Sequence, residues 1–448
     1  MGQAWAEQEL AGINLGDARL NKRSVKLLER LGDKPTVSIP SACNGWSETQ
    51  AAYRFFAQEE IGWEDILSPH FACTHERMRG RSVVLCIQDT TELDFNGQEI
   101  EGLGTLSYAA QRGMYVHPTY AVSPEREPLG VLDAWMWVRD RQAKASRSLP
   151  AGAKESCRWV EGYLRVAEQA AQMPDTRLVY IADREGDFID LMAQANAIGT
   201  PVDWLIRSAH NRKLVGEQDK LWEGFGEQHV LGEISFTLPA RKGQRARQVR
   251  QQVSARRCTL RSAKGEPIDV TALLAQEVDA PDAVKPIVWR LLTNRPVETL
   301  EAAAELIDWY RCRWEIEIFF DVLKNGCNVE EMQLSTIERL ELALALFMII
   351  AWRIQMLVRL GRTCPEMDCE VFFEREEWQA AYIVARKPIP KEPPPLNAVI
   401  RIVASFGGFL GRKGDGEPGT KALWTGLQRV MDFAAGIRAY RSGDESCV

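Results

Sequence analysis

The sequence predicts an α/β protein with helical regions at both ends of the chain, and three observations lead to this fold class. Short apolar runs at residues 83–87 and 178–181 have the length and composition of buried strands. Residues 297–326 instead carry apolar side chains at helical spacing, with Gly326 at the end of the pattern. Further helical patterns fill residues 1–70 and 361–448. Strands therefore occupy the middle of the chain.

Length and composition indicate a globular protein with more than one domain. The 448 residues are 45% hydrophobic and 26% charged, which is enough for a sizeable core. No run reaches the eighteen or so uninterrupted apolar residues of a membrane span, and the first ten residues lack a secretion signal. Ten cysteines are scattered singly, so we expect reduced thiols rather than disulfides or a zinc site. We expect a cytoplasmic protein without a membrane partner.

The charge distribution leaves a nucleic-acid partner open. A formal net charge of -7 argues against phosphate binding, which depends on Lys and Arg. Residues 241–264, however, contain no acidic residue and nine basic ones: Arg241, Lys242, Arg245, Arg247, Arg250, Arg256, Arg257, Arg261 and Lys264. This basic segment is either a polyanion site or a solvated strand or loop face.

The first half of the chain contains two similar strand endings. Short helices are expected over residues 1–70, and a strand then runs directly into Asp89. Strands at 114–122 and 128–138 and a helix near 156–172 follow. The next strand ends at Asp183, and Asp187 has the position of a residue that begins the next helix. Two aspartates thus end two buried strands.

The second half alternates between β-rich and helical segments. A strand at 202–208 precedes residues 209–285, which we expect to be an irregular β-rich insertion. A strand at 286–294 leads into the long helix of residues 297–326. More helices follow, interrupted by a Pro-rich break at 387–397 and a Gly-rich turn at 407–419, and the last helix ends near residue 441.

The long predicted helix carries a stripe of polar side chains. At 100° per residue, Tyr310, Arg313, Glu317 and Lys324 fall within a narrow sector about 21 Å long. Such a stripe can follow a nucleic-acid backbone. It can also be an exposed helix face with spaced ion pairs.

Two strand-end aspartates and a helix glutamate together indicate metal chemistry. Asp89 or Asp183 alone would be read as a helix cap or a turn residue. With Glu317, the three carboxylates can hold two divalent cations about 4 Å apart. Water or a 3′-hydroxyl would then attack phosphorus in line, with Arg and Lys offsetting the phosphate charge.

Nearly the whole chain resembles the bacterial cut-and-paste insertion-sequence transposases of the Tn5 type. QDTTELDF and IADREGD resemble the segments with the first two catalytic aspartates of that family, and YRCRWEIEIFFDVLK fits its Y-R-E-K signature. The resemblance implies an RNase H-like core, a catalytic and metal-binding triad of Asp89, Asp183 and Glu317, and two Mg²⁺ ions that Mn²⁺ can replace. Tyr310, Arg313 and Lys324 would grip the phosphates of the transposon end.

The resemblance also implies further contacts with DNA. Trp289 corresponds to an aromatic that stacks on a flipped base in hairpin-forming relatives, although a Trp in an apolar strand is usually a core residue. Arg207 would touch DNA near the active site, and its alternative role is an ion pair at a strand end. Arg19 and Arg23 match basic positions of the end-recognition domain. The basic segment matches the family's β-rich insertion.

These inferences give a three-part protein. Residues 1–70 form a helical domain that binds transposon ends, 71–360 an RNase H-like catalytic core with the insertion at about 209–285, and 361–448 a helical dimerisation region. The expected activity is transposition of DNA, by nicking, hairpin formation and opening, and strand transfer. The partners are transposon-end and target DNA and a second copy of the chain in the DNA complex, at the nucleoid of a bacterium. The alternatives are a nuclease or a catalytically silent DNA-binding protein of the same fold.

Overall fold

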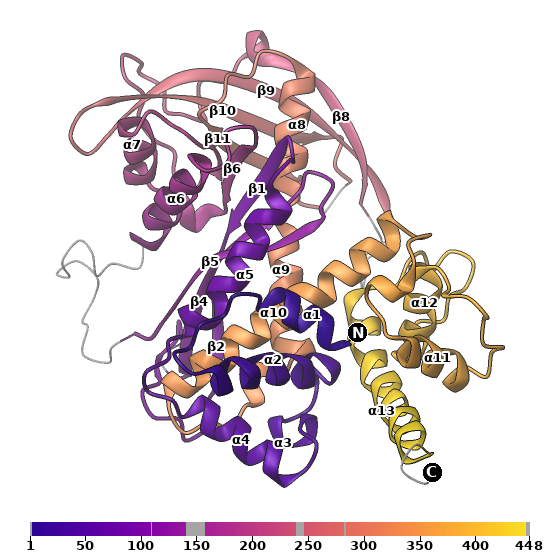
Figure 1. Ribbon diagram of the computed structural model, residues 1–448. Helices are drawn as coiled ribbons and strands as arrows, with labels where there is room; N and C mark the ends of the chain where they lie inside the picture. Colours follow the sequence, from indigo (N-terminus) through magenta and orange to yellow (C-terminus); the bar gives the residue numbers. More distant parts are fainter. Residues whose placement is uncertain (1, 109, 140–156, 239–245, 282–283, 445–448) are drawn as a thin grey trace.

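The computed structural model describes residues 2–108, 110–139, 157–238, 246–281 and 284–444. Within these residues, eleven strands form one mixed sheet. Its order is β2-β4-β1-β6-β7-β11-β10-β9-β8, and β3 and β5 also pair with β4. Helices cover the sheet and make up both ends of the chain (Figure 1). The predicted α/β class with helical flanks is confirmed.

The first half of the sheet is an RNase H-like core. Strand β4 is antiparallel to both β1 and β5, whereas β1, β6 and β7 are parallel to one another. Helix α6 precedes β6, and α7 connects β6 to β7. Burial of β1 and β6 explains why they read as continuous apolar runs. The bounds are β1 (Val83–Gln88), β2 (Thr91–Asp94), β3 (Gly104–Thr105), β4 (Arg112–Val122), β5 (Pro128–Trp137), α6 (Cys157–Ala170), β6 (Arg177–Ala182), α7 (Ile189–Ala197) and β7 (Asp203–Arg207).

The second half of the sheet corrects the expectation of an irregular insertion. Four antiparallel strands continue from β7, namely β11 (Val288–Thr293), β10 (Pro267–Val278), β9 (Arg247–Arg261) and β8 (Val230–Leu238). Buried Val249 and Val253 alternate with exposed polar residues at the start of β9. The many Arg and Gln residues of the exposed positions hid this alternation in the sequence. The basic segment is therefore largely a regular strand.

The N-terminal helices were expected and are present. They are α1 (Gly2–Glu9), α2 (Ala18–Asp33), α3 (Ile39–Ala42), α4 (Trp46–Phe56) and α5 (Trp63–Met78). The Asp17 side chain caps α2 by accepting a hydrogen bond from the Arg19 amide. One face of α2 is buried, and it carries Leu27, Leu28 and Leu31. Lys34 forms an ion pair of 2.8 Å with Asp432, so the N-terminal helices contact the C-terminal ones.

The predicted long helix over residues 297–326 is interrupted. Helix α8 (Leu300–Arg311) ends in a tightened turn, in which the Arg313 amide donates to Tyr310 and the Glu315 amide to Cys312. Helix α9 (Trp314–Asp321) follows and passes into a π-helical turn (Val322–Gly326). Tyr310, Glu317 and Lys324 thus lie in three separate helical segments, and Arg313 lies in the turn between the first two.

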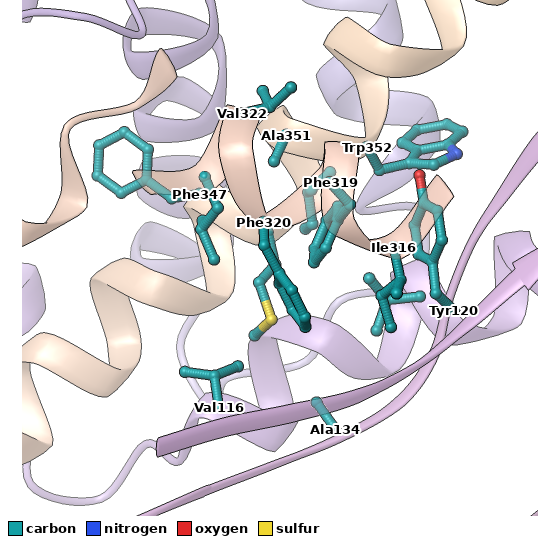
Figure 2. Close-up of a cluster of buried hydrophobic side chains, with 14 of the residues drawn as sticks. Val116, Tyr120, Ala134, Ile316, Phe319, Phe320, Val322, Phe347, Ala351 and Trp352 are labelled. Atoms are coloured by element: carbon teal, nitrogen blue, oxygen red, sulfur yellow. The ribbon is translucent and has the colours of Figure 1, made fainter. Parts of the chain in front are cut away.

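Helix α9 is fixed between the sheet and α10 (Ile337–Thr363). Figure 2 shows Ile316, Phe319 and Phe320 of α9 between the strands β4 and β5 on one side and α10 on the other. The Phe319 ring stacks on Tyr120 of β4 with a centroid distance of 4.7 Å. Each fully buried side chain of this kind contributes about 1.5–3 kcal/mol. Helix α10 is apolar enough to cross a membrane, but 89% of that apolar window is buried within the protein, so it is a core helix.

The C-terminal region is helical, as expected. It contains α11 (Arg375–Val384), α12 (Leu396–Phe406) and α13 (Thr420–Asp444). The predicted Pro-rich break separates α11 from α12, and the predicted Gly-rich turn separates α12 from α13. These helices share a core of their own, which includes Trp378, Val399 and Leu427. Figure 1 shows this bundle beside the C-terminal end of α10.

Candidate active site

Two aspartates lie at the ends of neighbouring parallel strands. Gln88 of β1 is in register with Ala182 of β6, so the next residues, Asp89 and Asp183, leave the same edge of the sheet. Asp89 is buried, and Asp183 is half-buried. The Asp183 carboxylate accepts a hydrogen bond of 2.7 Å from the Glu185 amide and begins a short 3₁₀ turn. Both carboxylates therefore have fixed backbone positions.

The third carboxylate, that of Glu317, is linked to Asp89 by hydrogen bonds from one arginine. Nη1 of Arg313 donates to Oδ2 of Asp89 at 2.6 Å and to Oε1 of Glu317 at 3.1 Å. The Arg313 side chain is only 9% exposed. The tightened turn between α8 and α9 places Arg313 where it can make both contacts. Asp89 and Glu317, far apart in sequence, are thus joined by one guanidinium.

The raised pKa of Asp89 reflects its burial first and the neighbouring carboxylate second. Burial raises the pKa of Asp89 to about 7, and the charge of Asp183 adds to this rise, while Arg313 opposes it. Among the described residues, no three acidic, histidine or cysteine side chains converge closely enough to hold a metal ion. Arg313 lies between two of the carboxylates, Asp89 and Glu317. The donor set of three carboxylates still has the chemistry that Mg²⁺ and Mn²⁺ prefer.

Tyr310 and Arg207 lie near this group. Tyr310 is buried, and Arg207 interacts with its hydroxyl. Burial raises the pKa of Tyr310, while the nearby charges of Arg313 and Arg207 lower it. Arg207 is the last residue of β7, so its position beside the site follows from the strand order. The predicted residues Tyr310, Arg313 and Arg207 are thus neighbours of the carboxylates.

Lys324 points toward a different partner. Its Nζ atom lies 3.7 Å from Oε1 of Glu330, which also accepts a hydrogen bond from the Asp94 amide. The π-helical turn separates Lys324 from the contacts of Arg313. The four residues of the predicted stripe therefore do not lie on one regular α-helix, because the chain tightens before α9 and passes into a π-helical turn after it.

Trp289 lies outside the cluster of carboxylates. It is half-buried in β11, and its ring stacks on Phe236 of β8 with a centroid distance of 5.8 Å. The guanidinium of Arg311 lies over the same Phe236 ring, 4.9 Å from its centroid. Phe236 therefore covers one face of the indole.

Part of the basic segment is neutralised. Arg247 pairs with Glu277, Arg250 with Asp279 and Arg256 with Glu217. Arg257, Arg261 and Lys264 are exposed. Arg241, Lys242 and Arg245 lie outside the described residues.

A buried carboxylate was assigned the wrong role. Asp187 was expected to begin a helix, but α7 starts at Ile189 and is preceded by Phe188. The Asp187 carboxylate instead accepts hydrogen bonds from the amides of Ala209 (2.6 Å) and His210 (3.0 Å) and pairs with Arg212 at 2.6 Å. It holds the segment that follows Arg207. No local sequence pattern identifies these distant donors.

A second buried contact lies directly behind Asp89. Oγ1 of Thr90 is 2.7 Å from Nδ1 of His117. Burial lowers the pKa of His117 to about 3, so the ring is neutral. His117 was not singled out in the sequence because a lone histidine in an apolar strand has no characteristic spacing.

The N-terminal helices expose a mixed polar and aromatic face. Arg19 is exposed and pairs with Asp17 at 2.7 Å, and Arg23 is half-buried on the same helix. Trp46, at the start of α4, is 78% exposed, although nothing in the sequence singled it out.

Comparisons with known proteins divide the chain into three matches. Residues 2–61 match the family model described as transposase DNA-binding, residues 171–353 the transposase DDE domain, and residues 349–447 the Tn5 transposase dimerisation domain. The DDE match includes Asp183 and Glu317, whereas Asp89 precedes it. Among solved structures, the chain is similar to the piggyBac transposase synaptic complex with hairpin DNA, with a TM-score of 0.32 and 8% identity. That match covers 67% of this chain and 54% of the other, so the chain spans about half of that relative.

Proposed function

The chain belongs to the Tn5-type transposases with a DDE domain, and from this membership we propose that it excises a DNA element and joins it to a target. The observation that carries the proposal is the meeting of Asp89 and Asp183 at one sheet edge, with Glu317 linked to Asp89 through Arg313. Cut-and-paste transposition then proceeds by nicking, hairpin formation and opening, and strand transfer.

Asp89, Asp183 and Glu317 would hold two Mg²⁺ ions, which Mn²⁺ can replace. Such ions, when bound, activate an attacking oxygen and stabilise the leaving oxygen of phosphoryl transfer. The burial of Asp89 excludes water from one side of the site, which strengthens electrostatic interactions there. A phosphate bound at this edge would be held by the neighbouring side chains of Arg313, Tyr310 and Arg207.

A hollow beside Glu317 is a suitable entry for DNA. Its volume is about 350 Å³, and Trp314, Arg359 and Arg362 contribute to its wall. Arg359 also pairs with the buried Glu315 at 2.7 Å and thereby ties α9 to α10. An aromatic ring with nearby guanidinium groups suits a nucleic-acid strand, since bases stack on aromatics and phosphates pair with arginine.

We assign recognition of the element's ends to the N-terminal helices. Trp46, Gln50 and Tyr53 form an exposed stripe on α4 at helical spacing. Glu48, on the same helix, is drawn away from this stripe by ion pairs with Lys26 and Arg30. The stripe therefore presents amide and aromatic groups without a carboxylate, and Gln side chains can read adenine in the major groove. Arg19 and Arg23 on α2 would contact the neighbouring phosphates.

Trp289 and the C-terminal region complete the proposed reaction. Trp289, which packs partly against the core and stacks on Phe236, would stack on a flipped base with its exposed part. Residues 349–447 would pair two copies of the chain on DNA, and Phe433 and Tyr440, both exposed on α13, are candidate contacts. We place the protein in the cytoplasm, at the nucleoid.

The test is incubation with Mg²⁺ and DNA that carries the element's own ends, followed by gel analysis. We expect nicked, hairpin and joined products. Glu317→Gln should abolish all three but spare DNA binding. Glu301→Gln is the matched control, since Glu301 is an exposed carboxylate in the first turn of α8 and does not line this hollow. Cleavage without joining would indicate a nuclease of the same fold, and binding without cleavage would indicate a catalytically silent DNA-binding protein.

A further inference from the structure

Arg313 occupies the place between two of the carboxylates that would hold metal ions. A single nitrogen, Nη1, contacts Oδ2 of Asp89 and Oε1 of Glu317. The side chain is almost entirely enclosed, so this contact is the main environment of its charge. The guanidinium thus neutralises part of the cluster of acidic side chains in the DNA-free protein.

This arrangement competes with a bound cation. Mg²⁺ requires its ligand oxygens at about 2.0–2.1 Å in near-octahedral geometry. Oxygens that already accept charged hydrogen bonds from Arg313 cannot turn fully to such an ion, and the guanidinium charge repels a dication. The observed spacing, in which no three described ligand side chains converge, is consistent with this competition.

Arg313 also lies over an exposed aromatic ring. It lies in the tightened turn between α8 and α9, where the backbone stays helical but the Arg313 amide donates to Tyr310, three residues earlier. The Trp314 ring centroid is 5.4 Å from its guanidinium, and Trp314 is 54% exposed. Because the guanidinium already lies over this ring, a shift along the ring and away from Asp89 and Glu317 would bring it to the surface of the hollow proposed for DNA.

We propose that Arg313 couples DNA binding to metal binding. Without DNA, it pairs with Asp89 and Glu317 and keeps divalent cations from binding tightly. A DNA phosphate draws the guanidinium away and frees both carboxylates as ligands. This proposal rests on the proposed function, and linkage requires that bound cations strengthen DNA binding by the same factor.

The coupling can be tested by measuring the affinity for Mn²⁺ with and without DNA. Free Mn²⁺ gives an electron paramagnetic resonance signal that decreases as the ion binds, so the decrease reports the bound fraction. The samples are the wild type, Arg313→Gln and the matched control Arg311→Gln, each alone and with a pre-cleaved duplex of the element's end. Arg311 also closes α8 but pairs with Asp308 on the surface. Thermal melting establishes that each variant is folded.

In the wild type, DNA should raise the Mn²⁺ affinity at least about tenfold, which corresponds to ~1.4 kcal/mol. Arg313→Gln alone should already bind Mn²⁺ about tenfold more tightly than the free wild type, and DNA should add less to it. Arg311→Gln should behave as the wild type does. If Arg313→Gln does not fold, Arg313→Lys serves instead and should give an intermediate affinity, because one ammonium cannot hold two carboxylates as a guanidinium does.

Two results separate the failure of this inference from that of the proposed function. Equal Mn²⁺ affinities for free wild type and free Arg313→Gln would overturn the coupling and leave the metal-dependent function intact. Absence of Mn²⁺ binding in every sample, including the DNA complexes, would overturn both.

Discussion

Replacing Asp187 with Asn should destabilise the catalytic core without removing any proposed ligand. Asp187 is buried and accepts two backbone hydrogen bonds from Ala209 and His210, besides its ion pair with Arg212. Hydrogen bonds to charged groups contribute roughly 1.5–3 kcal/mol each, and breaking a buried pair costs about 3–5 kcal/mol. Since Asn keeps one acceptor oxygen, we expect the free energy of unfolding to fall by about 3 kcal/mol.

Differential scanning fluorimetry of the purified chain measures this loss. For domains of 150–250 residues, a change of 1 kcal/mol shifts the melting temperature by roughly 2–4 °C, so the first transition should fall by about 6–12 °C. Asp190→Asn is the matched control, because Asp190 is exposed on α7 and its replacement should shift the transition by no more than about 2 °C. Equal shifts for the two variants would refute the assignment of Asp187 as the anchor of the segment after Arg207.

Three further results are expected. Burial raises the pKa of Asp33 to about 7, so the stability that its protonated form provides is lost as the pH rises from about 4 to 7. Asp33→Asn should therefore melt above the wild type at pH 8, by the equivalent of roughly 1–3 kcal/mol, and the gap should narrow toward pH 5; a gap independent of pH would contradict this reasoning. Trp289→Ala should leave nicking intact and slow the hairpin steps roughly ten- to hundred-fold, because stacking contributes about 1–3 kcal/mol per base; equal loss of both products with a lower melting temperature would make Trp289 a core residue. Replacing Arg257, Arg261 and Lys264 with Gln should reduce the salt dependence of DNA binding by roughly one unit of slope per lost phosphate contact, and an unchanged slope would make them solvated residues only.

The fold was predictable where local patterns agree with tertiary structure. The strands before Asp89 and Asp183 are short apolar runs because both of their faces are buried, and burial is a property that composition reveals. Strand β9 was harder to predict, since many of its exposed positions carry Arg or Gln, and its buried and exposed positions stop alternating at Ser254 and Ala255. The break at Cys312 and Arg313 was not predictable, because the sequence on both sides of it has uninterrupted helical periodicity.

The candidate site was predictable to a similar extent. Parallel strands end at the same sheet edge, so the neighbourhood of Asp89 and Asp183 follows from two strand assignments. The signature spacing identified Glu317 and Arg313, but only the structure places Arg313 between Asp89 and Glu317. The roles of Asp187 and His117 depend on partners far away in the chain, Ala209 and Thr90 among them, and such contacts leave no local pattern.

The net charge of -7 misrepresents the surfaces that would meet DNA. Several carboxylates form ion pairs within the protein; Glu48, for example, pairs with Lys26 and Arg30 on the N-terminal helices. The same pairing also consumes basic residues, since Arg247 is held by Glu277 and is unavailable to phosphate. Affinity for DNA therefore depends on the cations that remain unpaired at each surface rather than on the sum over the chain. If a paired carboxylate such as Glu277 were replaced by a basic residue, Arg247 would become free to bind phosphate. We expect this released arginine to change DNA binding more than the added net charge does.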